Sequence, residues 1–331
     1  MKSLPKTALI FGISGQDGSW LARLLLEKGY AVYGTSRDRE APGHGNLARL
    51  GIRDRLRLHS AVLNDFRSVA QVISDVRPSE IYNLAGQSSV GLSFEQPVET
   101  LDSVIHGTVN ILEAIRFLGL DTRFYNASSS ECFGNTGDGP ADETHPFHPR
   151  SPYGVGKAAA YWAVANYRES YDLFACSGIL FNHESPLRPA RYVTQKIVRG
   201  ATDIAEGRAQ RLTLGNLSVA RDWGWAPEYV DAMWRMLNHD APEDFVIATG
   251  QTHRLEEFVA LAFAHFGLNW HDHVIIDDTL LRPSDISVSV GNPAKAKRLL
   301  GWEAETRMPG VVAKLLEAEA RIRQSSTLQA V

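Results

Sequence analysis

The chain has 331 residues, of which 44% are apolar and 22% are charged, and its formal net charge is −4. Such a composition is typical of a globular protein with one large domain or two closely joined domains. The absence of a basic excess argues against a nucleic-acid partner, and no apolar run approaches the roughly 20 residues of a membrane-spanning helix. Cys132 and Cys176 make no disulfide framework and residues 1–6 show no signal-peptide pattern, so we expect a cytoplasmic protein without a membrane partner.

A glycine-rich turn follows the first predicted element, a buried strand over residues 7–11. Gly12, Gly15 and Gly18 are spaced by three in this turn, which also contains Gln16 and Asp17, and a helix follows. Glycines let the backbone approach a pyrophosphate, and the free N–H groups of a helix N-terminus favour its negative charge. The turn therefore predicts a dinucleotide-binding site.

The type of dinucleotide depends on the residues after the next strand, predicted over residues 31–34. An acidic residue there binds the 2′-hydroxyl of NAD, whereas an arginine accommodates the 2′-phosphate of NADP. Arg37 and Arg39 flank Asp38, so the pattern contains both signals. We expect NADP with Arg37 as its contact, and NAD is the alternative.

Strands and helices alternate regularly up to residue 180. Further strands are predicted at 56–59, 80–84, 123–127 and 174–180, with helices at 66–76, at 104–118 and after Ser151-Pro152. This alternation predicts an α/β fold with a Rossmann-like doubly wound parallel sheet. Small residues from Ala85 to Ser88 follow one strand, at a place that a nicotinamide can approach.

Four polar residues around this sheet suggest acid–base chemistry. Tyr153 and Lys157 are four positions apart, so they share one face of a helix, and a nearby ammonium group is expected to lower the tyrosine pKa. Ser129 and Glu131 come at the end of the strand predicted over 123–127, upstream of this helix. A hydroxyl, a carboxyl and an activated phenol in one pocket would form a catalytic set.

The regular pattern loosens after residue 180. One strand at 245–248 is expected to return to the main sheet, helices are expected at 193–206, 227–237, 255–266, 294–300 and 310–322, and residues 324–331 are expected to fray. We predict a dinucleotide-binding domain over 1–180 with a returning segment 222–250, and a smaller mixed α/β substrate lobe over 181–221 and 251–331. Basic residues of this lobe suit a diphosphate: Arg188, Arg191, Arg221, Arg282 and Lys196. His271 and His273 lack an evident third ligand, so no metal site is predicted.

Several stretches resemble the GDP-mannose 4,6-dehydratase family of the extended short-chain dehydrogenase/reductase superfamily. They are GQDGS from Gly15, IYNLA from Ile81, PRSPYG from Pro149, NHESP from Asn182, RDWG from Arg221 and GNPAKA from Gly291. The resemblance covers nearly the whole chain. It implies a GDP-sugar substrate, loss of water after internal hydride transfer from C4 to C6, a tightly bound NADP that is regenerated each turnover, and a homo-dimer or homo-tetramer.

The resemblance also assigns residues. Tyr153, Lys157 and Glu131 match the catalytic residues, and Ser129 stands where the family commonly has threonine. The cofactor would contact the glycine turn, Arg37, Tyr153 and Lys157, and in addition Leu84, Ala85 and His183. The substrate would contact Ser88, Asn182, Glu184, Val193, Lys196, Leu214, Gly215, Arg221, Arg282 and Asp285.

Some residues depart from the family pattern. Val62 stands in place of an aspartate that contacts adenine, and Asp285 is one methylene shorter than the usual glutamate. A related substrate such as a GDP-heptose therefore stays open, as do a nucleotide-sugar epimerase or reductase and a non-catalytic nucleotide sensor. Glu131 argues against the epimerase and the reductase, since neither needs a base at C5 beside the tyrosine.

Overall fold

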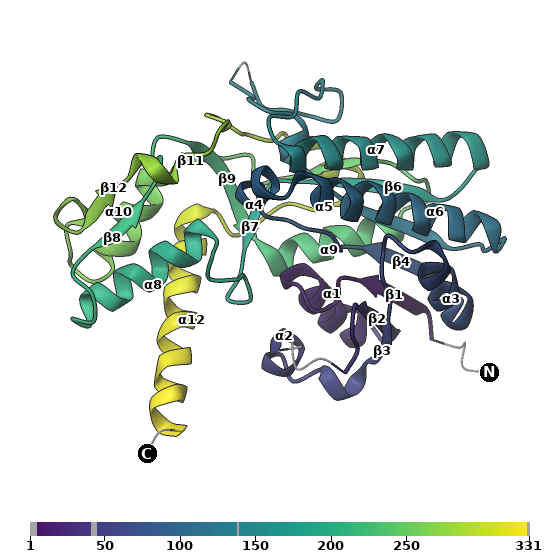
Figure 1. The fold of residues 1–331 in the computed structure, drawn as a ribbon, viewed down its shortest axis with the longest axis horizontal. Helices are drawn as coiled ribbons and strands as arrows, with labels where there is room; N and C mark the ends of the chain where they lie inside the picture. Colours follow the sequence, from purple (N-terminus) through teal and green to yellow (C-terminus); the bar gives the residue numbers. More distant parts are fainter. Residues whose placement is uncertain (1–4, 41–44, 138, 330–331) are drawn as a thin grey trace.

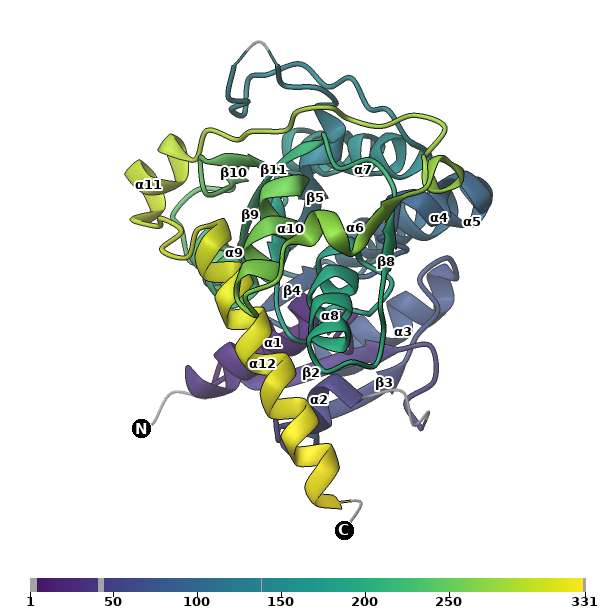
Figure 2. The same ribbon diagram turned by 90° about the vertical axis from the view of Figure 1, so that its left-hand side faces the viewer.

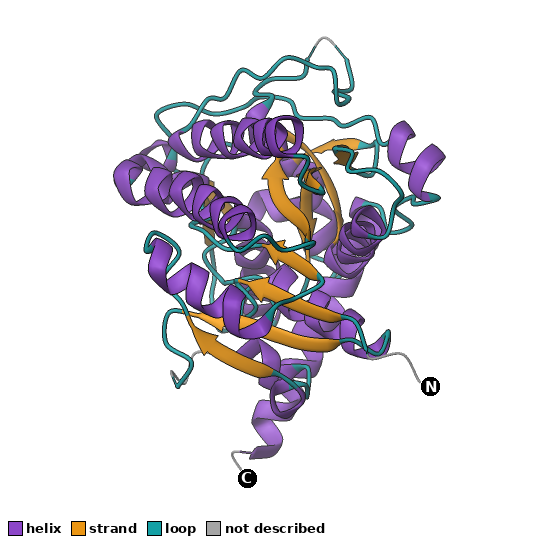
Figure 3. Cartoon of the chain, turned by 90° about the vertical axis from the view of Figure 1, so that its right-hand side faces the viewer, coloured by secondary structure: helices purple, strands orange, loops and turns teal. Residues whose placement is uncertain are grey.

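A seven-stranded parallel sheet forms the centre of the computed structural model, which describes residues 5–40, 45–137 and 139–329 (Figures 1 and 3). Its strands are β1 (Thr7–Phe11), β2 (Ala31–Ser36), β3 (Arg57–Ser60), β4 (Glu80–Asn83), β5 (Arg123–Ser129), β6 (Ala175–Leu180) and β10 (Phe245–Ile247). Their order is β10-β6-β5-β4-β1-β2-β3, so the chain winds outward from β1 in both directions. The predicted doubly wound parallel sheet is confirmed, including the strand that returns at residue 245.

Helices cover both faces of this sheet. On one face lie α3 (Phe66–Val76), α6 (Gly107–Phe117) and α7 (Pro152–Tyr171), and on the other α1 (Gln16–Glu27) and α9 (Ala226–Leu237). Shorter helices α2 (Gly45–Arg49), α4 (Val90–Glu95), α5 (Pro97–Leu101) and α11 (Ala294–Leu300) lie in the connections. Because both faces are covered, the strands are nearly continuous apolar runs, as in β1, where residues 8–11 are fully buried.

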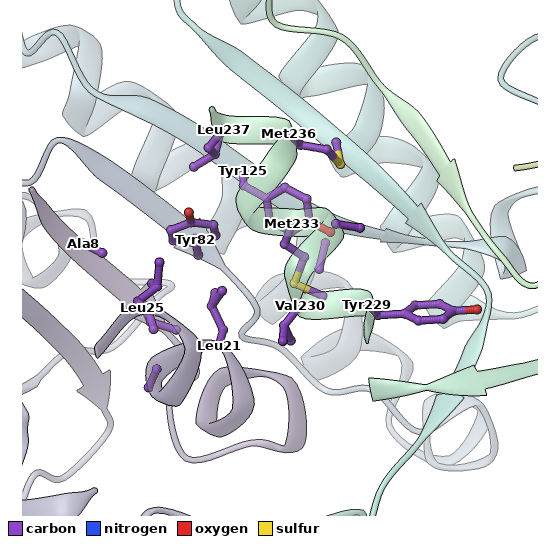
Figure 4. Packing of buried hydrophobic residues seen from close by; sticks show 14 of the residues in the cluster. Ala8, Leu21, Leu25, Tyr82, Tyr125, Tyr229, Val230, Met233, Met236 and Leu237 are labelled. Carbon is purple, nitrogen blue, oxygen red and sulfur yellow. The ribbon is translucent and has the colours of Figure 1, made fainter. Parts of the chain in front are cut away.

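The core between the sheet and the second helix layer is assembled from distant parts of the chain (Figure 4). Leu21 and Leu25 of α1 lie beside Val230 and Met233 of α9 in one buried cluster. Strands β4 and β5 contribute Tyr82 and Tyr125 to the same cluster. Burying side chains of this size stabilises the fold by about 1.5–3 kcal/mol each. Helix α9 therefore packs on the main sheet, although it follows the first strands of the second lobe in the sequence.

A second, smaller lobe contains two short sheets and three longer helices (Figure 2). One sheet has the order β11 (Thr252–Arg254), β9 (Ala220–Trp225) and β7 (Asn182–Glu184), and the other pairs β8 (Leu212–Leu214) with β12 (Val274–Ile276). Helices α8 (Val193–Ala205), α10 (Leu255–Ala264) and α12 (Met308–Gln329) share the core of this lobe. The division into a domain over 1–180 with 222–250 and a lobe over the remaining residues stays a prediction.

The structure differs from the sequence-based expectations in some local details. The helix expected over 104–118 is present but begins earlier, because α5 continues through a π-helical turn over Asp102–His106 into α6. Strands β7 and β8 were not predicted, since strands of three residues are too short to show a periodic pattern. Helix α12 continues to Gln329, so the fraying expected from residue 324 is absent from the described backbone up to that residue.

Candidate active site

One cavity of about 1680 Å³ opens at the carboxyl ends of the central strands and extends to the second lobe. This edge of a parallel sheet is where doubly wound folds bind their ligands. Every residue that the sequence analysis assigned to catalysis, cofactor or substrate lines this cavity: Gly12, Gly15, Gln16, Asp17, Gly18, Arg37, Leu84, Ala85, Ser88, Ser129, Glu131, Tyr153, Lys157, Asn182, His183, Glu184, Val193, Lys196, Leu214, Gly215, Arg221, Arg282 and Asp285. The structure thus brings the predicted residues together, while their individual roles stay predictions.

The glycine turn between β1 and α1 forms one wall of the cavity. Gly12 has a positive φ of 82°, and a Cβ atom there would lie 2.8 Å from the carbonyl oxygen of Leu84. A Cβ atom on Gly18 would lie 2.3 Å from the carbonyl oxygen of Gly12. At Gly15, the N-cap of α1, the nearest atom to an added Cβ would be that same oxygen at 3.3 Å. Side chains are therefore excluded at Gly12 and Gly18, and the N-terminus of the 12-residue helix α1 stays open to the cavity.

Helix α7 places Tyr153 and Lys157 on the cavity wall. Its N-cap residue Ser151 accepts a hydrogen bond from the backbone N–H of Gly154 at 3.0 Å, and Pro152 occupies the first helical position. A Cβ atom on Gly154 would lie 2.8 Å from the carbonyl oxygen of Glu131, so the glycine allows close approach to the turn Ser130–Cys132. Glu131 is thereby held next to the first turn of α7.

We expected a lowered pKa for Tyr153, and for the protein without a bound ligand this expectation was wrong. Burial raises the pKa of Tyr153 above its usual value, although a hydrogen bond with Ser129 opposes this effect. Burial also lowers the pKa of Lys157 to about 8. The Lys157 ammonium group lies 5.7 Å from the centre of the Tyr153 ring and donates a hydrogen bond to the carbonyl oxygen of Ala127 at 2.7 Å. Desolvation of the phenol thus outweighs the hydrogen bond with Ser129, and Lys157 is not among the main influences on the pKa of Tyr153.

Glu131 is a buried carboxyl group among charged neighbours. Burial raises its pKa, the guanidinium groups of Arg221 and Arg282 lower it, and the carboxylate of Asp285 raises it. The net direction is upward, so the group is held more readily in its protonated form than an exposed glutamate. A carboxyl group with a raised pKa is a stronger base than an exposed glutamate, which suits a group that takes up a proton and then releases it.

The far end of the cavity is basic. Arg221, on β9, pairs with Asp285 at 3.0 Å, and Arg282 lies 3.5 Å from the same carboxylate oxygen. Lys196 of α8 and Leu214 of β8 line the same cavity. Two guanidinium groups and an ammonium group around one cavity are suited to an anionic ligand of more than one phosphate.

The segment that contains β7 lies between the two ends of the cavity. The carboxylate of Glu184 accepts a hydrogen bond from the Thr194 hydroxyl at 2.7 Å and lies 3.3 Å from Nε of Arg188. The imidazole of His183 lies 3.0 Å from the carboxylate of Asp17. Both predicted binding residues therefore direct their side chains to protein partners. Arg37 lines the opposite end of the cavity, whereas Arg39 is exposed and pairs with Glu40 at 3.0 Å.

The cavity also contains residues that the predicted set omitted. Tyr192 lines it, and its hydroxyl lies 2.8 Å from that of Ser88. Asp102 and Ser103 of the π-helical turn line it as well. No motif identified these three residues, because they come from segments without a distinctive spacing. Within the described residues, no group of three His, Cys, Asp or Glu side chains is arranged to hold a metal ion.

Solved structures with the same fold include nucleotide-sugar enzymes. A UDP-glucose 4-epimerase from Thermotoga maritima matches with a TM-score of 0.85 and 22% identity over 96% of this chain and 99% of its own. A dTDP-glucose 4,6-dehydratase from Streptomyces venezuelae, solved with NAD, matches with a TM-score of 0.84 and 21% identity over 96% and 98%. At this level of identity the likeness shows the fold alone. No helix within the described part of the chain is long and apolar enough to cross a membrane.

Sequence comparison identifies the family, which the structural likeness does not. The profile of the family described as GDP-mannose 4,6 dehydratase matches residues 9–315. GDP-mannose 4,6 dehydratase 1 of Arabidopsis thaliana is 43% identical over 96% of this chain and 90% of its own length. The human GDP-mannose 4,6 dehydratase is 42% identical over 96% of this chain and 92% of its own length. The GDP-mannose 4,6-dehydratase of Vibrio cholerae is 40% identical over 98% of this chain and 96% of its own length. The chain therefore belongs to the GDP-mannose 4,6-dehydratase family.

Proposed function

We propose that the protein converts GDP-D-mannose to GDP-4-dehydro-6-deoxy-D-mannose, with internal hydride transfer from C4 to C6 and loss of water. The observation that carries this proposal is the position of Glu131 beside Tyr153, in the cavity that also contains the glycine turn. A phenol and a nicotinamide are sufficient for oxidation at C4. A separate carboxyl group is needed to remove the C5 proton, and that requirement distinguishes dehydration from simple oxidation.

The residues present fit a nicotinamide dinucleotide. The glycine turn leaves the N-terminus of α1 open to the cavity, where its free N–H groups suit a diphosphate. Leu84 and Ala85 follow β4 and line the same cavity. A bound dinucleotide would accept the C4 hydride and return it to C6, so that it ends each turnover in its starting oxidation state.

The side chains at the reacting centre then have separate tasks. Tyr153 takes the proton of the C4 hydroxyl, and Ser129 donates a hydrogen bond to the C4 oxygen. Lys157 contributes the positive charge that favours the phenolate, and with a pKa of about 8 it is charged at neutral pH. Glu131 removes the C5 proton and passes it to the departing C6 hydroxyl, and the proton on Tyr153 is available to C5 when C6 is reduced.

The basic end of the cavity is proposed to hold the nucleotide. Arg221 and Arg282 would bind the diphosphate, and Asp285 orients both guanidinium groups through its contacts of 3.0 and 3.5 Å. Lys196, Val193, Leu214 and Gly215 would line the nucleoside. Ser88, Asn182 and Glu184 lie nearer the sugar.

NADP is the proposed form of the cofactor. Arg37 lines the cavity after β2, where the ribose of a dinucleotide lies in this fold, whereas the Asp38 carboxylate accepts a hydrogen bond from the backbone N–H of Glu40 at 2.9 Å. Dissociation constants of NADP and NAD for the protein and its Arg37→Gln variant test this choice. The variant should lose the preference for NADP, and an unchanged ratio would assign the preference elsewhere.

The substrate is tested directly with purified protein and a panel of GDP-mannose, GDP-heptose, UDP-glucose and dTDP-glucose. We expect a 4-keto-6-deoxy product from GDP-mannose without an added reductant. If GDP-mannose gives no such product even with NADP and NAD supplied, the proposed function is wrong. Conversion of GDP-heptose in preference to GDP-mannose would keep the reaction but change the sugar.

We further propose a homo-dimer or homo-tetramer in the cytoplasm. Val155 and Trp162 are exposed apolar residues seven positions apart on one face of α7, and this face offers an apolar surface to a second copy. Both cysteines are free and buried, which suits a reducing compartment. Light scattering of the protein and of a Trp162→Glu variant tests the association. A monomeric mass for the unmodified protein would refute it.

A further inference from the structure

Both nitrogen atoms of the His183 ring face hydrogen-bond acceptors. Nδ1 lies 2.7 Å from the carbonyl oxygen of Phe181, and Nε2 lies 3.0 Å from the carboxylate of Asp17. A neutral imidazole has one donor and one lone pair, so one of these contacts would place a lone pair against an acceptor. Because the pKa of Asp17 is lowered and its carboxylate can only accept, the geometry requires an imidazolium ion. The ring also stacks on Tyr229 at 4.5 Å, an arrangement that stabilises a cation.

The charged pair joins two distant parts of the chain. Asp17 lies in the first turn of α1, within the glycine turn, whereas His183 lies on β7. Gln16 strengthens the connection, because its amide donates hydrogen bonds to Asp17 and to the carbonyl oxygen of His183 at 3.0 and 3.2 Å. Ser185 donates a hydrogen bond to the same amide group at 3.0 Å. The histidine side chain is only 8% exposed, so its main contact at this site is with Asp17 and little of it reaches the cavity.

The position of Asp17 creates an electrostatic conflict. A carboxylate in the first turn of a helix is favoured by the helix dipole, but a cofactor diphosphate would compete for the same N-terminus. Two anions at one helix end repel each other unless a cation lies nearby. We propose that His183 is a positioning residue whose positive charge neutralises Asp17, so that the N-terminus of α1 accepts the diphosphate of the cofactor. This inference rests on the proposed binding of a nicotinamide dinucleotide.

The charged neighbours determine the expected pH dependence. Burial lowers the pKa of His183, but the carboxylate of Asp17 outweighs burial and Arg188, and the net direction is upward. Burial raises the pKa of Asp17, and His183 reverses this effect, with help from Gln16 and Arg188. Glu184 pairs with Arg188, and Lys157 also interacts with Asp17. Both directions favour the ionised pair, which loses its positive partner as the pH rises through the raised pKa of His183.

The test measures NADP affinity between pH 6 and 9, by fluorescence or calorimetry, for the protein and its His183→Gln, Asp17→Asn and double variants. We expect His183→Gln to weaken NADP binding on the order of tenfold at pH 6, and the double variant to recover most of this loss. The affinity of the unmodified protein should fall as pH rises, and it should fall less in Asp17→Asn, where Lys157 still titrates. His253→Gln is the matched control, because His253 pairs with Glu257 at 3.0 Å outside the cavity.

A direct readout needs no variant. The ¹⁵N shifts of the His183 ring should show two protonated nitrogens at pH 6.5 and a titration midpoint above the ordinary value of about 6.5. A neutral ring at pH 6.5, or His183→Gln with the affinity and pH dependence of the unmodified protein, would overturn the inference. Failure of the unmodified protein to bind NADP or NAD at any pH would instead refute the proposed function.

Discussion

At the scale of single residues, the most informative group is the carboxyl of Glu131. It is buried, it lies beside the first turn of α7, and its neighbours are Arg221, Arg282 and Asp285. Charges of both signs around one buried carboxyl group adjust its pKa in opposite directions. These properties suit the role that we propose for Glu131, a proton carrier between C5 and the C6 hydroxyl.

Replacing Glu131 with glutamine should separate the two halves of the reaction. The amide keeps the size of the side chain but cannot take the C5 proton, so dehydration should fall by about 10²–10⁴-fold while oxidation at C4 persists. Single-turnover absorbance at 340 nm would then show a reduced nicotinamide that accumulates. Glu143→Gln is a suitable control, because Glu143 is also a glutamate whose pKa is raised by burial, and it lies outside the cavity. Full turnover by Glu131→Gln would contradict the assigned role.

The raised pKa of Glu131 predicts the acid limb of the pH profile. The base must be deprotonated, so kcat/KM should decrease as pH falls through a value above the ordinary 4.5. Arg282→Gln removes a charge that lowers this pKa and should move the limb to higher pH. Asp285→Asn removes a charge that raises it and should move the limb to lower pH. Movement of both limbs in the same direction would contradict this account of the site's electrostatics.

Sequence reasoning predicted which residues meet but not how they titrate. The four-residue spacing of Tyr153 and Lys157 was sufficient to place both on one face of a helix. The pKa of the phenol was predicted with the wrong sign for the protein alone, because the extent of burial depends on β5, α7 and the second lobe together. Similarly, the partnership of Asp17 with His183 joins positions 166 residues apart and has no signal in the local pattern.

At the scale of elements, the turn from β1 to α1 determines whether the cavity can hold a diphosphate. Its backbone packs so tightly that Gly12 and Gly18 leave no space for a Cβ atom. The first two turns of α1 bury Gly18 and Leu21, which couples the turn to the core behind it. A change in the turn should therefore affect cofactor binding and stability together.

Gly18→Ala should disrupt this turn. The added methyl group would lie 2.3 Å from the carbonyl oxygen of Gly12 and 2.7 Å from Cα of Ile13, both of which are backbone atoms that cannot rotate away. We expect a loss of about 1–3 kcal/mol in the free energy of unfolding, together with weaker NADP binding. Chemical denaturation and cofactor titration measure the two effects. Gly45→Ala is the control, since a Cβ atom there meets no atom within 4 Å. Equal effects of the two substitutions would contradict the role of close packing.

The elements of the main sheet were largely predictable, and those of the second lobe were less so. Helices over 66–76 and 294–300 have the predicted bounds, because local signals mark them: Asp65 caps the start of the first, and Gly301 ends the second. Strands β7, β8, β11 and β12 have three residues each, and their pairing partners are distant in sequence. The π-helical turn at 102–106 is an irregularity within a helical pattern that periodicity alone does not reveal.

At the scale of the whole molecule, the path of the chain brings the two proposed binding regions into one cavity. After β6 the chain enters the second lobe through β7 and returns to the first through α9 and β10. Strand β9, which precedes α9, contains Arg221 and pairs with β7, which contains His183. The segments proposed to bind the nucleotide and the cofactor are therefore neighbours within one small sheet.

The central claim is that the hydride removed from C4 returns to C6 of the same sugar within one cavity. A direct measurement starts from GDP-mannose labelled with deuterium at C4, which is incubated with the purified protein without any added reductant. Mass spectrometry and NMR then locate the deuterium in the product. We expect a 4-keto-6-deoxy product with the deuterium at C6. Absence of this product, or a product whose C6 contains no deuterium, would contradict it.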